Sequence, residues 1–271
     1  MTRYTLITGA SGGIGEALAH LFAKDHHNLI LVARSEDKLL KLKERLESNY
    51  AVSVYTIPKD LTLNGSTHEI YQETLEQNFI VETLVNNAGT GYHAEFLDSD
   101  YGRQMNLIKL NIEALVSLTY LFGQSMKIHG YGRILNVSSL ASLTPGPYMS
   151  VYYASKAFVS AFSEGLKEEF KGSNISITTL NPGPTSTSFQ MVSDLQGSNM
   201  FKRLRVAHVK DVALVGYRGL KKKKTKVYYG FSNKVMVVLS RLTPTYITRK
   251  FAMMINGKPS LKEEIKHEEI D

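Results

Sequence analysis

The chain has 271 residues, 43% of them hydrophobic and 21% charged, which suits one large α/β domain with a full core. It has no cysteine, which excludes disulfides and thiolate chemistry and fits a cytoplasmic location; no metal site is expected. The formal net charge of +7 suits an anionic partner, but no aromatic and basic code for nucleic acid occurs. We expect neither a signal peptide nor a membrane-spanning helix, because a strand-like run begins at Tyr4 and long uncharged apolar runs are absent.

Residues 4–8 are predicted to form a buried strand that leads into a glycine-rich turn and then a helix. Glycine permits a positive φ and lets backbone N–H groups approach a pyrophosphate at the start of a helix. The turn is therefore predicted to bind a dinucleotide, with a turn that holds no ligand as the alternative. The predicted binding residues are Gly9, Ser11, Gly12, Gly13, Ile14 and Gly15.

Residues 28–33 are the second predicted strand, and Arg34 follows it. An acidic residue at this place selects NAD, whereas a guanidinium suits the 2′-phosphate of NADP. The sequence therefore predicts a preference for NADP(H) over NAD(H). Ser35 is predicted to bind the cofactor or to cap the next helix.

The next predicted strand, residues 52–57, ends near Asp60 and Leu61, which are expected to lie beside the adenine ring. A loop or helix-capping role is the alternative for Asp60. A polar helix is expected over residues 67–77, followed by a strand and a small-residue turn over 83–89. Asn87, Ala88 and Gly89 in that turn fit close approach to a ligand. The regular alternation predicts a Rossmann-type, doubly wound parallel sheet of about seven strands with helices on both faces.

Residues 101–129 are predicted to form one long helix with Asn111 inside it, and residues 132–138 form the fifth strand. Ser139 follows that strand, and Tyr152 and Lys156 lie four apart on the next helix. An ammonium beside a phenol favours the phenolate, so Lys156 is expected to lower the pKa of Tyr152 and fit it for proton transfer. The alternative is a plain surface pair on a helix.

In this order and spacing, four motifs resemble those of the short-chain dehydrogenase/reductase family, in its single-domain subgroup. They are Thr8-Gly9-x-x-x-Gly13-x-Gly15, Asn86-Asn87-Ala88-Gly89, Ser139, and Tyr152-x-x-x-Lys156. The resemblance covers about residues 4–230. It implies that hydride passes between a nicotinamide and a carbonyl carbon while Tyr152 transfers a proton to the oxygen.

The resemblance also assigns supporting roles. It implies that Ser139 hydrogen-bonds the substrate oxygen, that Lys156 also binds the nicotinamide ribose, and that Asn111 holds a water linked to Lys156. After a strand at 175–180, the segment 181–187 resembles the loop that binds the nicotinamide carboxamide. Its predicted cofactor residues are Pro182, Gly183, Thr185 and Thr187. A homodimer or homotetramer is implied as well.

Residues 189–204 resemble the substrate lid of the family, and Phe189, Met191 and Leu195 indicate an apolar pocket. A helix over 209–219 and a seventh strand over 226–229 complete a catalytic domain assigned to residues 1–230. Residues 231–271 are predicted to form a basic extension with two amphipathic helices and a frayed end from Leu261. These helices cover the cleft, form an oligomer contact or lie on a membrane; the first two interpretations are favoured over peripheral membrane contact.

The predicted function is an NADPH-dependent carbonyl reductase, reversible as an alcohol dehydrogenase, acting on a small-molecule substrate. The C-terminal segment resembles that of long-chain ketoacyl and hydroxysteroid reductases, which implies a bulky apolar substrate. The alternatives are a catalytically silent NADP-binding sensor and a peripheral membrane protein on the same fold.

Overall fold

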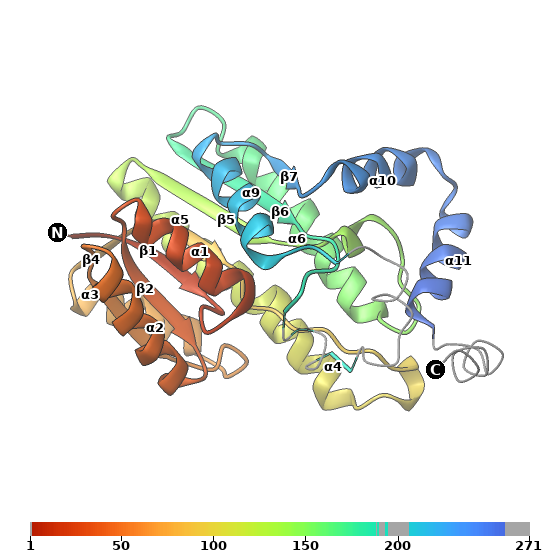
Figure 1. The fold of residues 1–271 in the computed structure, drawn as a ribbon, viewed down its shortest axis with the longest axis horizontal. Coiled ribbons are helices and arrows are strands. Elements are labelled where there is room, and N and C mark those ends of the chain that lie inside the picture. The colour runs from red at the N-terminus through yellow and green to blue at the C-terminus, as the bar shows by residue number, and fades with distance from the viewer. Residues whose placement is uncertain (1, 188, 190–192, 195–205, 258–271) are drawn as a thin grey trace.

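The computed structural model describes residues 2–187, 189, 193–194 and 206–257 (Figure 1). Its sheet has seven strands in the order β3-β2-β1-β4-β5-β6-β7, and every neighbouring pair is parallel. The strands are β1 Thr2–Thr8, β2 Asn28–Ala33, β3 Val54–Pro58, β4 Phe79–Asn86, β5 Gly132–Val137, β6 Ile175–Asn181 and β7 Lys226–Tyr228. The strand order reverses between β1 and β4, as in a Rossmann fold, so the predicted doubly wound sheet is confirmed.

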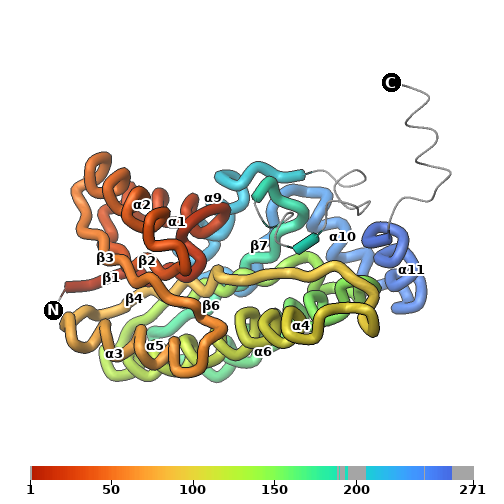
Figure 2. Tube along the Cα trace, turned by 90° about the horizontal axis from the view of Figure 1, so that it is seen from below, coloured from red at the N-terminus to blue at the C-terminus, as the bar shows by residue number. Residues whose placement is uncertain are grey.

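Helices cover both faces of the sheet, and Figure 2 shows the two layers. One face carries α1 Gly13–Lys24, α2 Glu36–Asn49 and α9 Val209–Lys221. The other carries α3 Ser66–Glu76, α4 Tyr101–Ile108, α5 Ala114–His129 and α6 Ser150–Glu169. Successive residues of a strand point to opposite faces, so Ile7 packs in the first core and Leu6 in the second. This is why the strands read as continuous apolar runs.

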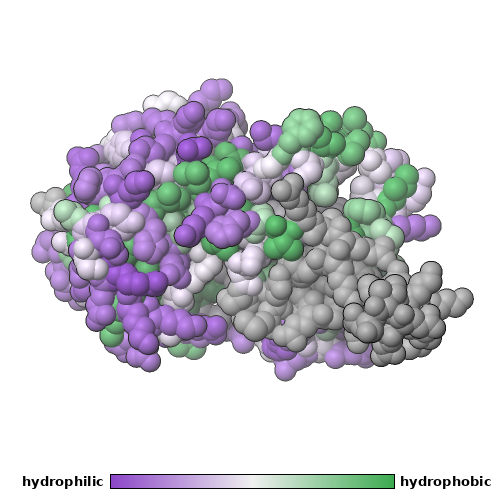
Figure 3. All heavy atoms as spheres, viewed as in Figure 1, coloured by the Kyte–Doolittle hydropathy of each residue, from purple (hydrophilic) through white to green (hydrophobic). Residues whose placement is uncertain are grey.

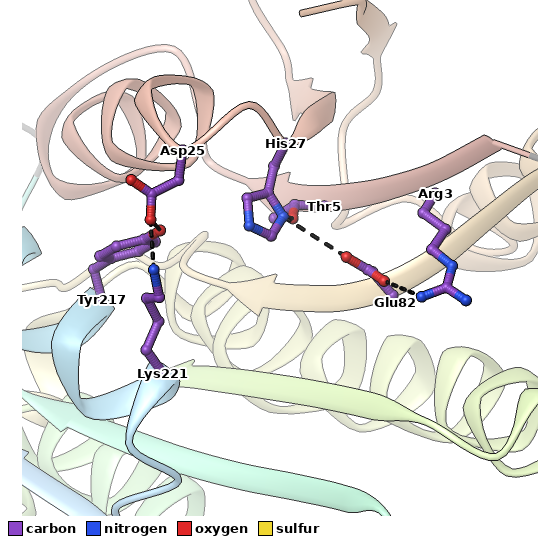
Figure 4. Close-up of polar contacts among 7 residues, drawn as sticks. All are labelled: Arg3, Thr5, Asp25, His27, Glu82, Tyr217 and Lys221. Carbon is purple, nitrogen blue, oxygen red and sulfur yellow. Dashed lines mark hydrogen bonds and ion pairs between the residues drawn. The ribbon is translucent and has the colours of Figure 1, made fainter.

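A polar cluster joins α1 to α9 at the edge where the strands begin (Figure 4). Asp25, just after α1, accepts hydrogen bonds from the Tyr217 hydroxyl at 2.5 Å and from Lys221 Nζ at 2.6 Å. Glu82 in β4 pairs with Arg3 at 3.4 Å. The Asp25 contacts hold α1 to α9, and the Glu82–Arg3 pair joins β4 to β1, both at the edge opposite the predicted site.

The long helix predicted for residues 101–129 is interrupted. A π-helical segment, Lys109–Glu113, separates α4 from α5. The buried positions before the segment are Gln104 and Leu107, whereas Met105 and Ile108 are only half-buried. Gln104, Leu107 and Asn111 follow one another at intervals of three and four residues, so they share the face that is turned into the protein.

The C-terminal segment forms the two predicted helices, α10 Phe231–Leu242 and α11 Thr245–Asn256, which are separated at Thr243-Pro244. Both helices lie beyond the edge of the sheet, away from β1 and β2 (Figure 1). Within the described ranges, no helix has the length and apolar character needed to cross a membrane. The predicted lid residues Met191 and Leu195 and the tail from Leu261 lie outside the described residues.

Candidate active site

One cavity of about 1600 Å³ opens along the edge where the strands end and continues beneath α10 and α11. The loops that follow β1, β2, β4, β5 and β6 meet there because parallel strands end at the same edge. It is lined by these predicted site residues: Gly9, Ser11, Gly12, Gly13, Ile14, Arg34, Asp60, Leu61, Asn87, Ala88, Gly89, Ser139, Tyr152, Lys156, Pro182, Gly183, Thr185 and Thr187.

Three predicted residues lie off the cavity wall. Gly15 packs against the Gly9 carbonyl, and Asn111 is 1% exposed behind the wall. Ser35 occupies the N-cap position of α2, but its side chain makes no capping hydrogen bond, so the expected cap is wrong.

The glycine turn is shaped by close approach of two chain segments. Gly9 has φ +63°, and a Cβ there would lie 2.9 Å from the Cα of Ala88. The Asn87 amide donates to the carbonyls of Thr8 at 2.9 Å and Gly9 at 3.1 Å. Only a residue without a side chain fits between these segments, so the turn after β1 and the turn after β4 form one wall.

We predict that Gly15→Ala destabilises the fold, whereas the neighbouring Gly12→Ala does not. A Cβ on Gly15 would overlap the Gly9 carbonyl oxygen and lie 2.6 Å from Asn87 Nδ2, but a Cβ on Gly12 would meet nothing within 4 Å. Overpacking of this kind costs about 1–3 kcal/mol. Urea unfolding should show that loss for Gly15→Ala and a change within about 0.5 kcal/mol for Gly12→Ala. Equal stability of the two variants would contradict the assigned packing.

Arg34 lies at the end of the cavity that faces β2 and β3. Its side chain is 74% exposed, and its Nη1 is 4.0 Å from Asp60 Oδ2. The other Asp60 oxygen accepts hydrogen bonds from the Thr62 N–H and hydroxyl, at 2.9 and 2.8 Å. Lys38 and Lys59 line the same region, although the sequence interpretation did not include them. This end of the cavity therefore carries three cations.

Gly89 lets two polar side chains approach the backbone after β4. A Cβ there would lie 3.2 Å from Asn111 Oδ1 and 3.3 Å from Lys156 Nζ. Asn111 accepts from the Thr90 N–H and donates to the Thr90 carbonyl, both at 2.9 Å, and donates to Ser155 Oγ at 3.0 Å. Both amide hydrogens are thus used to tie this loop to α6. The role of Asn111 in holding a water stays a prediction.

Ser139, Tyr152 and Lys156 meet in the middle of the cavity. Ser139 follows β5 and accepts a hydrogen bond from the Ala141 N–H at 3.1 Å. Lys156 Nζ lies 5.8 Å from the centre of the Tyr152 ring and donates to the Val137 carbonyl at 3.0 Å. Ser138, which precedes Ser139, donates a hydrogen bond to the Lys156 carbonyl at 2.8 Å, and this contact gives Ser138 a structural role.

Burial shifts the proton affinity of both titratable groups of this trio. It raises the pKa of Tyr152 to about 12, while hydrogen bonding by Ser139 acts in the opposite direction. It also lowers the pKa of Lys156 to about 8. The expected lowering of the Tyr152 pKa is therefore wrong for the protein itself, because the cost of burying a phenolate exceeds the effect of the nearby groups. Tyr152 holds its proton at neutral pH.

The loop after β6 closes the cavity on the far side. Ser139 Oγ lies 3.4 Å from the Pro182 carbonyl, which the Leu140 N–H also approaches at 2.8 Å. Thr187 Oγ1 accepts from the Phe189 N–H at 3.2 Å, and its methyl group faces Gly13. The predicted carboxamide loop thus lies between the glycine turn and Ser139.

Beyond Tyr152 the cavity becomes apolar. The Phe189 ring centre lies 5.4 Å from that of Tyr152. The other apolar residues on this part of the wall are Leu140, Leu143, Met149, Val235, Leu239, Ile247, Phe251 and Ile255. Helices α10 and α11 thus complete the wall of the cavity, in agreement with the interpretation that they cover the cleft.

Asn256 links α11 to the active site, and no local motif predicts it. It is fully buried, accepts from the Tyr153 hydroxyl at 3.1 Å and donates to the Pro147 carbonyl at 2.9 Å. Its own carbonyl lies 2.6 Å from His93 Nε2. These bonds fix the end of α11 beside the residue that follows Tyr152.

Comparison with known proteins agrees with this geometry. A profile of the short chain dehydrogenase family matches residues 3–196. Mouse 17-beta-hydroxysteroid dehydrogenase type 3 is 35% identical over 192 residues, which are 69% of this chain and 61% of the mouse protein. The match therefore spans about three fifths of that relative. Sulfoacetaldehyde reductase 2 of Chromohalobacter salexigens is 35% identical over 194 residues, 71% of this chain and 76% of that protein.

A solved structure has the same fold over a larger share of this chain. A short-chain dehydrogenase from Sphingobium yanoikuyae in complex with NADPH has a TM-score of 0.79 and 28% sequence identity, covering 89% of this chain and 94% of that chain. Sequence and structure thus agree over the region that forms the glycine turn, the loop after β4 and the Tyr152–Lys156 pair. The chain belongs to the short-chain dehydrogenase/reductase family.

Proposed function

We propose that the protein is an NADPH-dependent carbonyl reductase, reversible as an alcohol dehydrogenase, that acts on a bulky apolar ketone or secondary alcohol. The observation that carries the proposal is the convergence of Ser139, Tyr152 and Lys156 on one cavity that begins at the glycine turn. The two relatives are named for different substrates, one for a hydroxysteroid and one for sulfoacetaldehyde. The apolar wall of the cavity therefore indicates the substrate class.

The residues present fit a dinucleotide. The backbone of Gly9 and Gly13 adopts φ +63° and +56°, and Gly9, Ser11, Gly12 and Gly13 line the first part of the cavity, where a pyrophosphate would approach the backbone closely. Arg34, Lys38 and Lys59 supply cations for a 2′-phosphate. The bound cofactor would supply the hydride.

The chain's own residues would orient the substrate and move the proton. Ser139 donates a hydrogen bond to the substrate oxygen and Tyr152 gives it a proton. A pKa near 12 keeps that proton available at neutral pH. The Lys156 ammonium, 5.8 Å from the centre of the Tyr152 ring, would stabilise the negative charge that develops on the Tyr152 oxygen. The apolar side chains beyond Tyr152 hold the rest of the ketone and exclude water.

A panel of ketones tests the substrate class. We expect NADPH oxidation with ketones of increasing length, such as 2-butanone, 2-octanone and 2-dodecanone, to show a KM that falls as apolar area is buried. Burying each added methylene contributes about 0.8 kcal/mol at most to binding. A tenfold change in affinity corresponds to about 1.4 kcal/mol, so several added carbons should lower KM by tenfold or more. NADPH binding without turnover of any ketone would instead favour the sensor, and a KM independent of length would contradict an apolar subsite.

We predict that Arg34→Asp reverses the cofactor preference. The substitution removes a phosphate-binding cation and places a carboxylate where a free ribose hydroxyl can be bound. The ratio of kcat/KM for NADPH to that for NADH should fall by about 100-fold or more, since charge-assisted hydrogen bonds are worth about 1.5–3 kcal/mol. Lys41→Asp in α2, exposed and off the cavity wall, makes a similar charge change and should leave the ratio unaltered. An unchanged ratio in Arg34→Asp would exclude the 2′-phosphate role.

A further inference from the structure

The charges of the chain are divided unevenly. Residues 212–257 contain ten of the 32 Lys and Arg residues and none of the 25 Asp and Glu residues. Six of these ten cations, at positions 218–226, precede α10, and the other four lie in α10 and α11, which contain no acidic residue. Such an asymmetry favours binding to an anionic surface.

The outer face of α10 combines a cation with exposed apolar side chains. Lys234, Val238 and Leu242 follow one another at intervals of four residues and so share a face of the helix. Val238 is 58% exposed and Leu242 is 77% exposed, and neither lines the cavity. Figure 3 shows hydrophobic surface gathered over α10, apart from the mostly hydrophilic surface over the sheet. A helix that only covers the cleft would turn such side chains inward.

The outer face of α11 repeats this combination. Tyr246, Arg249, Lys250 and Met253 are spaced i, i+3, i+4 and i+7, and all four are exposed and off the cavity wall. Among the described residues, neither these two cations nor Lys234 makes an ion pair, in contrast to Lys226, which pairs with Glu164. These cations are thus available to an external anion.

We propose that the outer faces of α10 and α11, defined by the three residues of α10 and the four of α11 named above, bind the surface of an anionic lipid membrane. Exposed apolar side chains next to Lys and Arg are the pattern of a helix that lies in the headgroup region. A bilayer satisfies both components, because its headgroups pair with the cations and its acyl boundary takes up the apolar side chains.

Other occupants satisfy only part of the pattern. A nucleic acid would pair with the cations and leave Val238 and Leu242 in water. A second copy of this chain that docked through the same faces would bring cations of α10 and α11 together, and like charges across an interface are unfavourable. Of the three interpretations that the sequence allows for this extension, the outer faces thus favour the third, while the inner faces cover the cleft.

Vesicle flotation of the full chain tests the proposal. We expect binding to vesicles of phosphatidylcholine with about 30% phosphatidylglycerol to be at least 25-fold tighter than to pure phosphatidylcholine, because each cation contributes about fivefold. About 0.5 M NaCl should release most of the protein. Vesicle binding does not depend on turnover, so this experiment is independent of the oxidoreductase activity.

Two pairs of variants locate the surface. Lys234→Glu with Lys250→Glu should weaken binding by at least about 25-fold, and Val238→Ser with Leu242→Ser by about tenfold. The control for the charge change is Lys41→Glu with Lys127→Glu, and the control for the loss of apolar area is Leu97→Ser with Ile128→Ser. All four control residues are exposed and lie outside α10 and α11. Both controls should bind within about threefold of the unmodified protein, since only distant charge and area have changed.

A gain of signal makes the test independent of lost binding. The chain contains no tryptophan, so Leu242→Trp introduces a single reporter. Its emission should shift to shorter wavelength when anionic vesicles are added, whereas that of Ile128→Trp should not. Absence of the shift, equal binding to neutral and anionic vesicles, or equal loss in the control variants would each overturn the proposal. So would a concentration-dependent dimer that the Val238 and Leu242 variants abolish without vesicle binding.

Discussion

Tyr152→Phe is expected to reduce ketone turnover by about 10³-fold while NADPH affinity stays within about threefold. The substitution removes only the hydroxyl, and a positioned general acid contributes about 10²–10⁴-fold. Its ring would keep its contact with Phe189, whose centre lies 5.4 Å away. Single-turnover kinetics with saturating NADPH would measure the loss, and fluorescence titration would measure the cofactor affinity.

Tyr153 provides a matched control for this experiment. Its hydroxyl is turned away from the reaction, toward Asn256 at 3.1 Å, although the residue is adjacent in sequence and equally buried. Tyr153→Phe should therefore keep most of the turnover and lose about 1 kcal/mol of stability with its hydrogen bond. If Tyr152→Phe kept its activity, or if both variants lost it equally, Tyr152 would not be the proton donor.

The sequence predicts the fold, and it selects residues that line one cavity, because both depend on local signals. Each strand is a short apolar run, and each loop at its carboxyl end carries a glycine, amide or hydroxyl motif. Parallel strands bring those ends together without further information. This is why eighteen residues from separate motifs line one cavity. Gly15 belongs to the same glycine-rich turn as Gly9 and Gly13, but it lies behind the cavity wall.

The sequence predicts the structure less well where the backbone departs from a regular helix. A 3.6-residue pattern assumes a regular helix, so it cannot show that Lys109–Glu113 is π-helical. Asn256 is missed for a different reason. Its partners Tyr153 and Pro147 are more than 100 residues away, and nothing in its own neighbourhood marks it as buried.

The spacing of residues in the sequence also does not show how strongly burial changes their pKa values. A separation of four positions places Tyr152 and Lys156 on one face of α6, and that much is predictable. Whether the charge of the lysine or the loss of water dominates depends on the surrounding protein. Here burial dominates for both residues, and it raises the pKa of the tyrosine and lowers that of the lysine.

Lys156→Met is expected to reduce turnover by about 100-fold or more and to make the protein more stable at pH 7. Burial lowers the pKa of Lys156 from its ordinary 10.5 to about 8, so the folded protein holds the ammonium at a cost of about 3 kcal/mol below pH 8. Methionine has a similar length and carries no charge. After loss of the hydrogen bond to the Val137 carbonyl, worth about 1 kcal/mol, a net gain of about 2 kcal/mol remains.

The sign of the pH dependence follows from the same shift. Between pH 8 and 10.5 the unfolded chain binds more protons at Lys156 than the folded chain, so the unmodified protein gains stability as the pH rises through this window. The advantage of Lys156→Met should therefore shrink between pH 7 and about pH 9.5, as measured by urea unfolding at both pH values. Lys127→Met, at an exposed position of α5, should change stability by less than about 0.5 kcal/mol at either pH. A Lys156→Met protein that is less stable at pH 7, or whose difference is constant with pH, would show that the buried ammonium carries no such cost.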